Sequence, residues 1–280
     1  MRTRGWIALD IDGTITAEQD VIPASVVSYL KTLTEEEWRI AIATGRSVTF
    51  ASKPLQVFPF PFLLIAQNGS VAVEMPHREV CLKRYLPSAT ILALESHTTE
   101  AGLDYVIYNG FEAGDLCYWR PSRFSSQDRA YLQSLQARQK ESWHAVSDYA
   151  SVIQSGFPMA KCFGSKSAID ALASRLARAG LFHATSIRDP FHETYHILLI
   201  SDRQASKGAT LTHAIDQLGQ KGDVVIAAGD DENDMSLLLA ADRRIAMSHA
   251  PASLKAVAHL IAPDVREQGI IAALQKMVAL

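Results

Sequence analysis

Residues 6–16 read Trp-Ile-Ala-Leu-Asp-Ile-Asp-Gly-Thr-Ile-Thr, and they say most about the architecture of this chain. The apolar residues before Asp10 predict a strand that is buried on both faces. Asp12 follows two residues later, and Gly13 lets the backbone turn sharply. Two acids at the carboxyl end of a buried strand can serve as a nucleophile and a metal ligand. A carboxylate nucleophile that forms an acyl-phosphate is an established route of covalent catalysis. Asp, Gly and Thr are also ordinary turn residues, so this stretch alone leaves a plain turn open.

Length and composition describe an ordinary globular chain. It has 280 residues, of which 48% are hydrophobic and 20% charged, enough for one large domain or two smaller ones. The net charge of -3 gives no indication of nucleic-acid binding. No apolar run approaches the length that spans a bilayer. The N-terminus leads directly into the first predicted strand, so we expect no signal peptide. The three cysteines are far apart and odd in number, which favours a cytoplasmic location.

Four further apolar runs resemble the first, and each ends in glycine or polar residues. They are residues 39–43 before Thr44-Gly45-Arg46, 62–66 before Gln67-Asn68-Gly69, 224–228 before Gly229-Asp230-Asp231, and 245–247 before Ser248-His249. Helical signals separate several of them, with Pro23 opening one helix and Asn233 or Asp234 another. This alternation predicts an α/β fold with a Rossmann-like parallel sheet. Ligands bind at the carboxyl ends of such strands, so one edge should gather Asp10, Thr44, Asn68, Asp230 and Ser248.

The pattern changes between about residues 84 and 201. The predicted elements are half-exposed strands at Tyr105–Tyr108 and Cys117–Trp119, a strand at His196–Ile200, and helices capped by Ser125 or Ser126 and by Ser165. We therefore expect an α+β domain, residues 84–201, inserted into a discontinuous core of residues 1–83 and 202–280.

Four motifs follow one another along the chain: Asp10-Ile11-Asp12-Gly13-Thr14, Ala43-Thr44-Gly45-Arg46, Ser206-Lys207-Gly208 and Gly229-Asp230-Asp231-Glu232-Asn233-Asp234. Their order resembles that of the motifs of the haloacid dehalogenase superfamily. Four motifs in order are highly specific. The chain most closely resembles the Cof-like branch, small phosphatases with a C2-type cap inserted after the third core strand. Residues 66–70 and 246–250 also resemble that branch. The resemblance covers the whole core, and the cap resembles the family only loosely.

The resemblance implies a Mg²⁺-dependent phosphatase with an aspartyl-phosphate intermediate. Asp10 would attack phosphorus, and Asp12 would protonate the leaving group and then activate water. Mg²⁺ would be bound by Asp10, the backbone carbonyl of Asp12, and Asp230. Lys207 would supply the positive charge that holds Asp10 and the phosphate together.

The resemblance also implies phosphate-binding and supporting residues. Phosphate oxygens would bind Ile11, Thr44, Gly45, Lys207 and Asn233. Asp234 would orient Lys207 or the waters on the metal. Asn68 would either orient the nucleophile's loop or simply cap the third strand. We assign no role to Asp231, and Ser248-His249 stands where the family often has Gly-Asn.

One further motif is misleading. His192-Glu193-Thr194-Tyr195-His196 matches the H-E-x-x-H signature of zinc proteases, which works only on a helix. Pro190 precedes it, and a β-rich apolar run follows at residues 197–200. In a strand, residues four apart lie about 13 Å from each other. We therefore expect structural histidines here and no zinc site.

We expect the substrate to be a small phosphorylated metabolite, a sugar phosphate or a related phosphomonoester. The cap would close over it and exclude water. One alternative is a phosphotransferase or phosphosugar mutase with the same intermediate. Another is a catalytically silent regulator that binds sugar phosphates, against which the intact set of Asp10, Asp12, Lys207 and Asp230 argues. We expect no nucleic-acid or membrane partner, and a monomer or small homo-oligomer.

Overall fold

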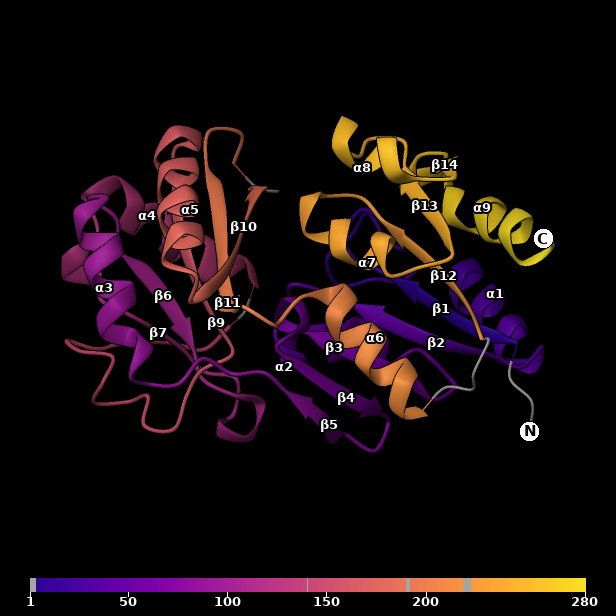
Figure 1. Cartoon of the computed structure of the whole chain (residues 1–280), viewed down its shortest axis with the longest axis horizontal. Helices are drawn as coiled ribbons and strands as arrows, with labels where there is room; N and C mark the ends of the chain where they lie inside the picture. The colour runs from indigo at the N-terminus through magenta and orange to yellow at the C-terminus, as the bar shows by residue number, and fades with distance from the viewer. Residues whose placement is uncertain (1–3, 140, 190–191, 219–222) are drawn as a thin grey trace. The chain divides into compact units, whose positions relative to one another are not determined.

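The computed structural model describes residues 4–139, 141–189, 192–218 and 223–280 (Figure 1). The chain divides into two compact units, one of Met1–Lys83 with Ser206–Leu280 and one of Arg84–Ala205. The second unit ends a few residues later than the sequence pattern predicts. The last strand of that unit runs to Asp202, and a turn follows in which Ala205 N donates to Asp202 O at 2.8 Å.

The first unit is built on an eight-stranded sheet in the order β14-β13-β12-β1-β2-β3-β4-β5. Its parallel strands are β1 (Gly5–Leu9), β2 (Trp38–Ala43), β3 (Phe62–Ala66), β12 (Val224–Gly229), β13 (Arg243–Met247) and β14 (Leu260–Ala262). The five strands predicted from continuous apolar runs are all present. An antiparallel hairpin of β4 (Val71–Met75) and β5 (Glu79–Lys83) extends one edge. It was not predicted, because β5 alternates exposed with half-buried residues instead of forming an apolar run.

The connections between the strands leave the centre of this sheet in opposite directions. β1 lies between β12 and β2. The chain continues from β1 to β2 on one side, and from β12 to β13 on the other (Figure 1). Neighbouring strands whose connections leave in opposite directions form a topological switch point, where ligands bind at the carboxyl ends. In this sheet the switch point lies between β1 and β12.

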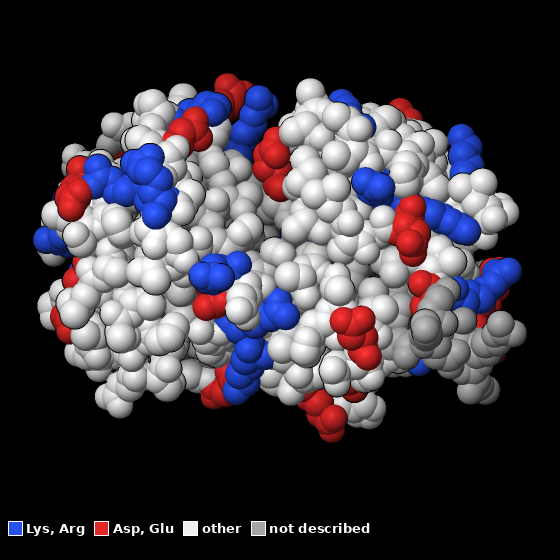
Figure 2. All heavy atoms as spheres, viewed as in Figure 1, with Lys and Arg blue, Asp and Glu red and all other residues white. Residues whose placement is uncertain are grey.

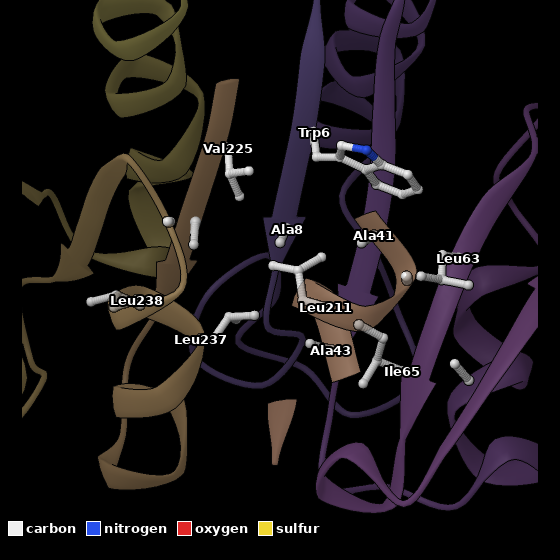
Figure 3. Close-up of a cluster of buried hydrophobic side chains, with 14 of the residues drawn as sticks. Trp6, Ala8, Ala41, Ala43, Leu63, Ile65, Leu211, Val225, Leu237 and Leu238 are labelled. Atoms are coloured by element: carbon white, nitrogen blue, oxygen red, sulfur yellow. The ribbon is translucent and has the colours of Figure 1, made fainter. Parts of the chain in front are cut away.

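Helices cover the sheet on both sides. The helices of this unit are α1 (Ala24–Glu35), α2 (Val48–Leu55), α6 (Lys207–Leu218), α7 (Met235–Leu239), α8 (Ala252–Val257) and α9 (Gly269–Val278). Figure 3 shows the core beneath α6 and α7, where Leu211 and Leu237 pack against small residues of the sheet such as Ala8 and Ala43. In a strand the neighbours of Ala8 point to the opposite face. These neighbours of Ala8 are buried as well. α1 contacts β2 and α9 contacts β13, and neither helix contributes to the core beneath α6 and α7.

The second unit is an α+β domain, as the sequence predicts. Its six-stranded sheet has the order β10-β11-β9-β6-β7-β8. The strands are β6 (Tyr105–Tyr108), β7 (Cys117–Trp119), β8 (Trp143–Ala145), β9 (Met159–Gly164), β10 (Phe182–Arg188) and β11 (His196–Asp202), and the helices are α3 (Thr90–Glu100), α4 (Ser126–Gln139) and α5 (Lys166–Ala179). Ser165 caps α5 through its Oγ, which accepts from Ala168 N at 3.4 Å.

One expectation about this second sheet is wrong. Tyr105–Tyr108 is not half-exposed, because every residue of β6 is buried. Tyr105 joins a core shared with α3 and α5, whereas Tyr108 joins a second core that contains Leu132 and Leu135 of α4. Aromatic residues on both faces of a strand therefore indicate a sheet that helices cover on both sides.

The surface carries charges of both signs. Figure 2 shows basic and acidic side chains interspersed on the visible face of each unit. Among the helices of the described residues, none combines the length and the apolar character that crossing a bilayer requires.

A glycine fixes the start of α6 against α7. A Cβ added to Gly208 would lie 1.9 Å from the main-chain oxygen of Ser236, and Gly208 N donates to Ser236 Oγ at 3.2 Å. The absence of a side chain at this position therefore lets the two helices approach.

We predict that Gly208→Ala destabilises the protein by about 2–4 kcal/mol, although alanine is the better helix former, because the helices must separate. Thermal or urea unfolding measures this loss. Ala209→Ser, at the exposed neighbouring position, is the control and should change stability little. An unchanged melting temperature for Gly208→Ala would contradict the close packing.

Candidate active site

Two acids follow the two central strands at the switch point. Asp10 comes directly after β1, and Asp230 directly after β12. Leu9 lies opposite Ala228 in the register, and Asp10 N donates to Ala228 O at 3.1 Å. The two strands therefore end at the same level, and both carboxylates emerge at one edge of the sheet.

Lys207 joins these acids from the first turn of α6. Its side chain is fully buried, and its Nζ donates to Asp10 Oδ1 and to Asp234 Oδ1, each at 2.6 Å. Burial by itself lowers the pKa of Lys207, but the charges and hydrogen bonds of Asp10 and Asp234 outweigh it and raise the pKa above its usual value. The ammonium group is therefore charged at neutral pH. The structure thus brings together the lysine and two of the acids that the sequence singled out.

The second oxygen of Asp10 is available for chemistry. Asp10 Oδ2 is buried and has no hydrogen-bond partner among the described residues. Burial raises the pKa of Asp10 well above its usual range, Lys207 lowers it, and the charges of Asp234 and Asp230 raise it further. A carboxylate in this position gains from an added cation, because the added charge favours its ionised form.

The oxygens of three carboxylates lie close enough to share a cation. One oxygen each from Asp10, Asp230 and Asp234 lies within 4.8 Å of the others, and among the described residues these form the group that could hold a metal. An all-oxygen set suits Mg²⁺. Asp234 already accepts from Lys207 on Oδ1 and from the amides of Asp230 (2.9 Å) and Asp231 (3.3 Å) on Oδ2. Both oxygens of Asp234 are therefore engaged, whereas Asp10 Oδ2 has no partner among the described residues.

The Asp12 side chain points to a different partner. Arg46 Nε donates to Asp12 Oδ2 at 2.8 Å and Arg46 Nη2 to Asp12 Oδ1 at 2.5 Å, which makes a bidentate pair. Arg46 is buried, lies over the ring of Phe50 and donates to Gln19 O at 2.8 Å. The Asp12 side chain itself is 55% exposed. Arg46 could not be assigned a role from sequence, because nothing in its motif shows which acid it contacts.

Thr44, Gly45 and Asn68 lie at the ends of β2 and β3. Thr44 is buried, its Oγ1 accepts from Arg46 N at 3.1 Å, and its carbonyl accepts from Asn68 N at 2.9 Å. Gly45 is half-buried beside it. Asn233, in the short 3₁₀ helix η4 (Glu232–Asp234), donates from Nδ2 to Asn68 Oδ1 at 3.5 Å. These polar groups therefore form a connected rim beside the acids.

The loop after β3 adopts a left-handed backbone for three residues in a row. Gln67, Asn68 and Gly69 have φ values of 49°, 56° and 94°. A Cβ on Gly69 would lie 2.2 Å from Ser206 O, and Thr210 of α6 donates to Gly69 O at 2.6 Å. Backbone strain of this kind gathers at functional sites. Gly69 therefore lets this loop pack against the residue before Lys207.

The loop after β1 is compact. The Ile11 carbonyl accepts from the amides of Thr14, Ile15 and Thr16 at 3.3, 3.1 and 3.2 Å. Thr14 Oγ1 is buried without a partner among the described residues. Gly13 has a φ of 78°, and a Cβ there would lie 2.2 Å from Asp230 Oδ2. The glycine therefore lets the loop pass close to the second acid.

Asp231 and Asp230 differ in their surroundings. Asp231 caps η4, with Oδ1 accepting from Glu232 N at 2.8 Å, and burial raises its pKa to about 6. Burial also raises the pKa of Asp230, although a hydrogen bond from His249 lowers it. His249 Nε2 lies 3.1 Å from Asp230 Oδ2. The sequence marked His249 only as a departure from the family pattern.

The H-E-x-x-H motif does not form a helix. His192 and Tyr195 form a turn, in which Tyr195 N donates to His192 O at 3.1 Å, and His196 begins β11. Pro190 lies outside the described residues. The two histidines therefore do not share one helical face.

The raised pKa of Asp231 predicts how metal-free stability depends on pH. A carboxyl whose pKa rises on folding stabilises the folded state below the ordinary aspartate pKa of about 4, and this contribution is lost as the pH rises through about 6. Asp231→Asn cannot titrate but can still cap η4. In EDTA, the difference in melting temperature between the variant and the wild type should shift by about 2–5 °C in favour of the variant as the pH rises from 5.5 to 7.5. An equal difference at both pH values would contradict the raised pKa of Asp231.

Comparison with known proteins identifies the family. A family model described as haloacid dehalogenase-like hydrolase matches residues 7–274. A phosphoglycolate phosphatase of Methanopyrus kandleri is 22% identical over 275 residues, covering 97% of this chain and 96% of that protein. The pyridoxal phosphate phosphatase YbhA of Escherichia coli is 23% identical over 258 residues, covering 92% and 93%.

A solved structure extends the likeness to the fold. A haloacid dehalogenase-like hydrolase from B. subtilis superposes with a TM-score of 0.79 at 19% identity, covering 97% of this chain and 99% of that one. The match therefore includes both units as well as the motifs at the edge of the sheet. Because the family model spans nearly the whole chain, the protein belongs to the haloacid dehalogenase-like hydrolases.

Proposed function

We propose that the protein is a Mg²⁺-dependent phosphatase that hydrolyses small phosphomonoesters through an aspartyl-phosphate on Asp10. The family and its relatives, several of which are named phosphatases, support phosphoric monoester hydrolysis. One observation carries the rest of the proposal. Asp10 Oδ2 is buried and has no hydrogen-bond partner in the described part of the chain, while Lys207 and Asp230 lie beside Asp10.

The first step is attack by Asp10. Lys207 holds Oδ1, so Oδ2 is the oxygen that forms a bond to phosphorus while the bond to the leaving oxygen breaks in line. The fixed ammonium also offsets the charge of the incoming phosphate, and Asp234 keeps it in place. The product of this step is the acyl-phosphate and an alcohol.

Asp12 is the proposed acid and base. It gives a proton to the leaving oxygen in the first step. In the second it takes a proton from the water that attacks phosphorus, which releases phosphate and restores Asp10. Arg46 bonds both carboxylate oxygens and is itself locked by Phe50 and Gln19. We propose that Arg46 fixes the direction in which Asp12 approaches the substrate.

The cation would be held by Asp10, the backbone carbonyl of Asp12, and Asp230. When bound, it would neutralise phosphate oxygens and let an anionic nucleophile approach an anionic substrate. The unpartnered Asp10 Oδ2 and the all-oxygen surroundings fit such an ion. Asp234 is proposed to orient Lys207 rather than to bind the metal.

The remaining polar residues are proposed to bind phosphate. They are Ile11 and Gly45 through their main chains, and Thr44, Lys207 and Asn233 through their side chains. Asn68 would hold Asn233 in place, since the two amides are in contact.

The substrate is proposed to be a small phosphorylated metabolite, such as a sugar phosphate. Relatives named for phosphoglycolate and for pyridoxal phosphate support a small phosphomonoester without selecting one. We propose the second unit as the cap that selects the leaving group. The free thiols of Cys81, Cys117 and Cys162 fit the proposed cytoplasmic location.

We predict that Asp10→Asn lowers kcat for p-nitrophenyl phosphate with Mg²⁺ by at least about 10³-fold, because an amide cannot attack phosphorus. The same substitution at an exposed position of α6, Asp216→Asn, is the matched control and should leave kcat unchanged. Full activity in Asp10→Asn would overturn the nucleophile assignment. A requirement for a sugar bisphosphate in the wild type would instead indicate a phosphotransferase.

A second prediction concerns Arg46. Arg46→Met keeps an apolar stem over Phe50 but removes the donors to Asp12. Release of p-nitrophenolate needs no proton, so its pre-steady-state burst should stay near the wild-type rate. Steady-state turnover of p-nitrophenyl phosphate should fall about 10–100-fold, because the water of the second step must lose a proton. With an alkyl phosphate, whose leaving oxygen also needs a proton, both the first and the second step should slow by this factor.

The control for this experiment is Lys53→Met, which removes another cation near the same Phe50 ring. It should match the wild type in both phases. Equal slowing of burst and steady state by Arg46→Met would show that Arg46 acts on the fold of the site rather than through Asp12.

A further inference from the structure

His249 occupies a fixed position beside Asp230. It follows β13 in a turn that is closed by Ala250 N donating to Met247 O at 3.0 Å. Its Nε2 lies 3.1 Å from Asp230 Oδ2, and the side chains of His249 and Asp230 are 39% and 18% exposed. The histidine is thus the more exposed partner of an acid that lies close to Asp10.

The geometry separates His249 from the inner group of ligands. Asp10, Asp230 and Asp234 each offer an oxygen within 4.8 Å of the others, and among the described residues His249 does not belong to such a group with Asp10. Two ligands of one Mg²⁺ lie at most about 4.2 Å apart, since each bond is about 2.1 Å. His249 therefore contacts the carboxylate of Asp230 without belonging to the group of carboxylates that could share an ion.

The loop after β1 confines this pair. A Cβ built on Gly13 would lie 2.2 Å from Asp230 Oδ2 and 3.0 Å from His249 Nε2. The backbone of Asp230 is held as well, because its amide donates to Asp234 Oδ2 at 2.9 Å. With the main chain fixed, the remaining freedom of Asp230 is rotation of its carboxylate, and the hydrogen bond from His249 limits that rotation.

We propose that His249 is a positioning residue of the cation site, which sets Mg²⁺ affinity by holding Asp230 Oδ2. An imidazole with its proton on Nε2 donates this bond to the carboxylate. Partners of this kind, which bond a ligand without touching the metal, change metal affinity about 10–100-fold. The inference rests on the proposed function, because Asp230 is a metal ligand only in that proposal.

The test is the dissociation constant of Mg²⁺, measured by titration calorimetry, with Mn²⁺ binding followed by electron paramagnetic resonance as a second readout. His249→Ala should weaken both ions about 10–100-fold. His249→Gln should bind them nearly as the wild type does, because its amide nitrogen reaches the place of Nε2. His77→Ala, at an exposed histidine of the same unit, is the matched control. Melting temperatures in EDTA should agree among all four proteins.

Asp230→Asn distinguishes this inference from the proposed function. If Asp230→Asn binds Mg²⁺ as the wild type does, the proposed metal site itself is wrong. If Asp230→Asn loses Mg²⁺ while His249→Ala keeps the wild-type dissociation constant, the inference about His249 alone is overturned. Loss of affinity in His249→Gln equal to that in His249→Ala would also overturn it, because the hydrogen bond would then not be the cause.

Discussion

The buried ammonium group of Lys207 holds the site of this protein together. It contacts Asp10 and Asp234 at 2.6 Å each, and the three side chains come from segments that are far apart in the sequence. An unpaired charge in such a place would cost several kcal/mol, so each partner requires the others. Among the described residues, the other oxygen of Asp10 has no hydrogen-bond partner. The buried ion pair and the proposed nucleophile are therefore one feature of this fold.

The sheet explains why these segments meet. β1 and β12 are neighbours at the switch point, so the residues that follow them, Asp10 and Asp230, share one edge. Close packing completes the arrangement, because Gly208 lets α6 approach α7 and Gly69 lets the loop after β3 reach Ser206. The backbone of the first unit thus places these candidate site residues.

Much of this could be predicted from the sequence, and the exceptions have a common cause. Continuous apolar runs indicated five of the six parallel strands, and Ser165 indicated a helix start, because these signals are local. β5 was missed because an edge strand lacks an apolar run. Arg46 and His249 were not assigned because their partners, Asp12 and Asp230, depend on how distant loops fold together. Local pattern gives the residue type and its place, but not its tertiary partner.

Crystallisation with Mg²⁺ and beryllium fluoride, a mimic of the acyl-phosphate, tests the central claim most directly. The account predicts beryllium bonded to Asp10 Oδ2, Mg²⁺ between Asp10 and Asp230, and Lys207 still in contact with Asp234. Beryllium fluoride on another residue, or Lys207 turned away from the acids, would contradict it.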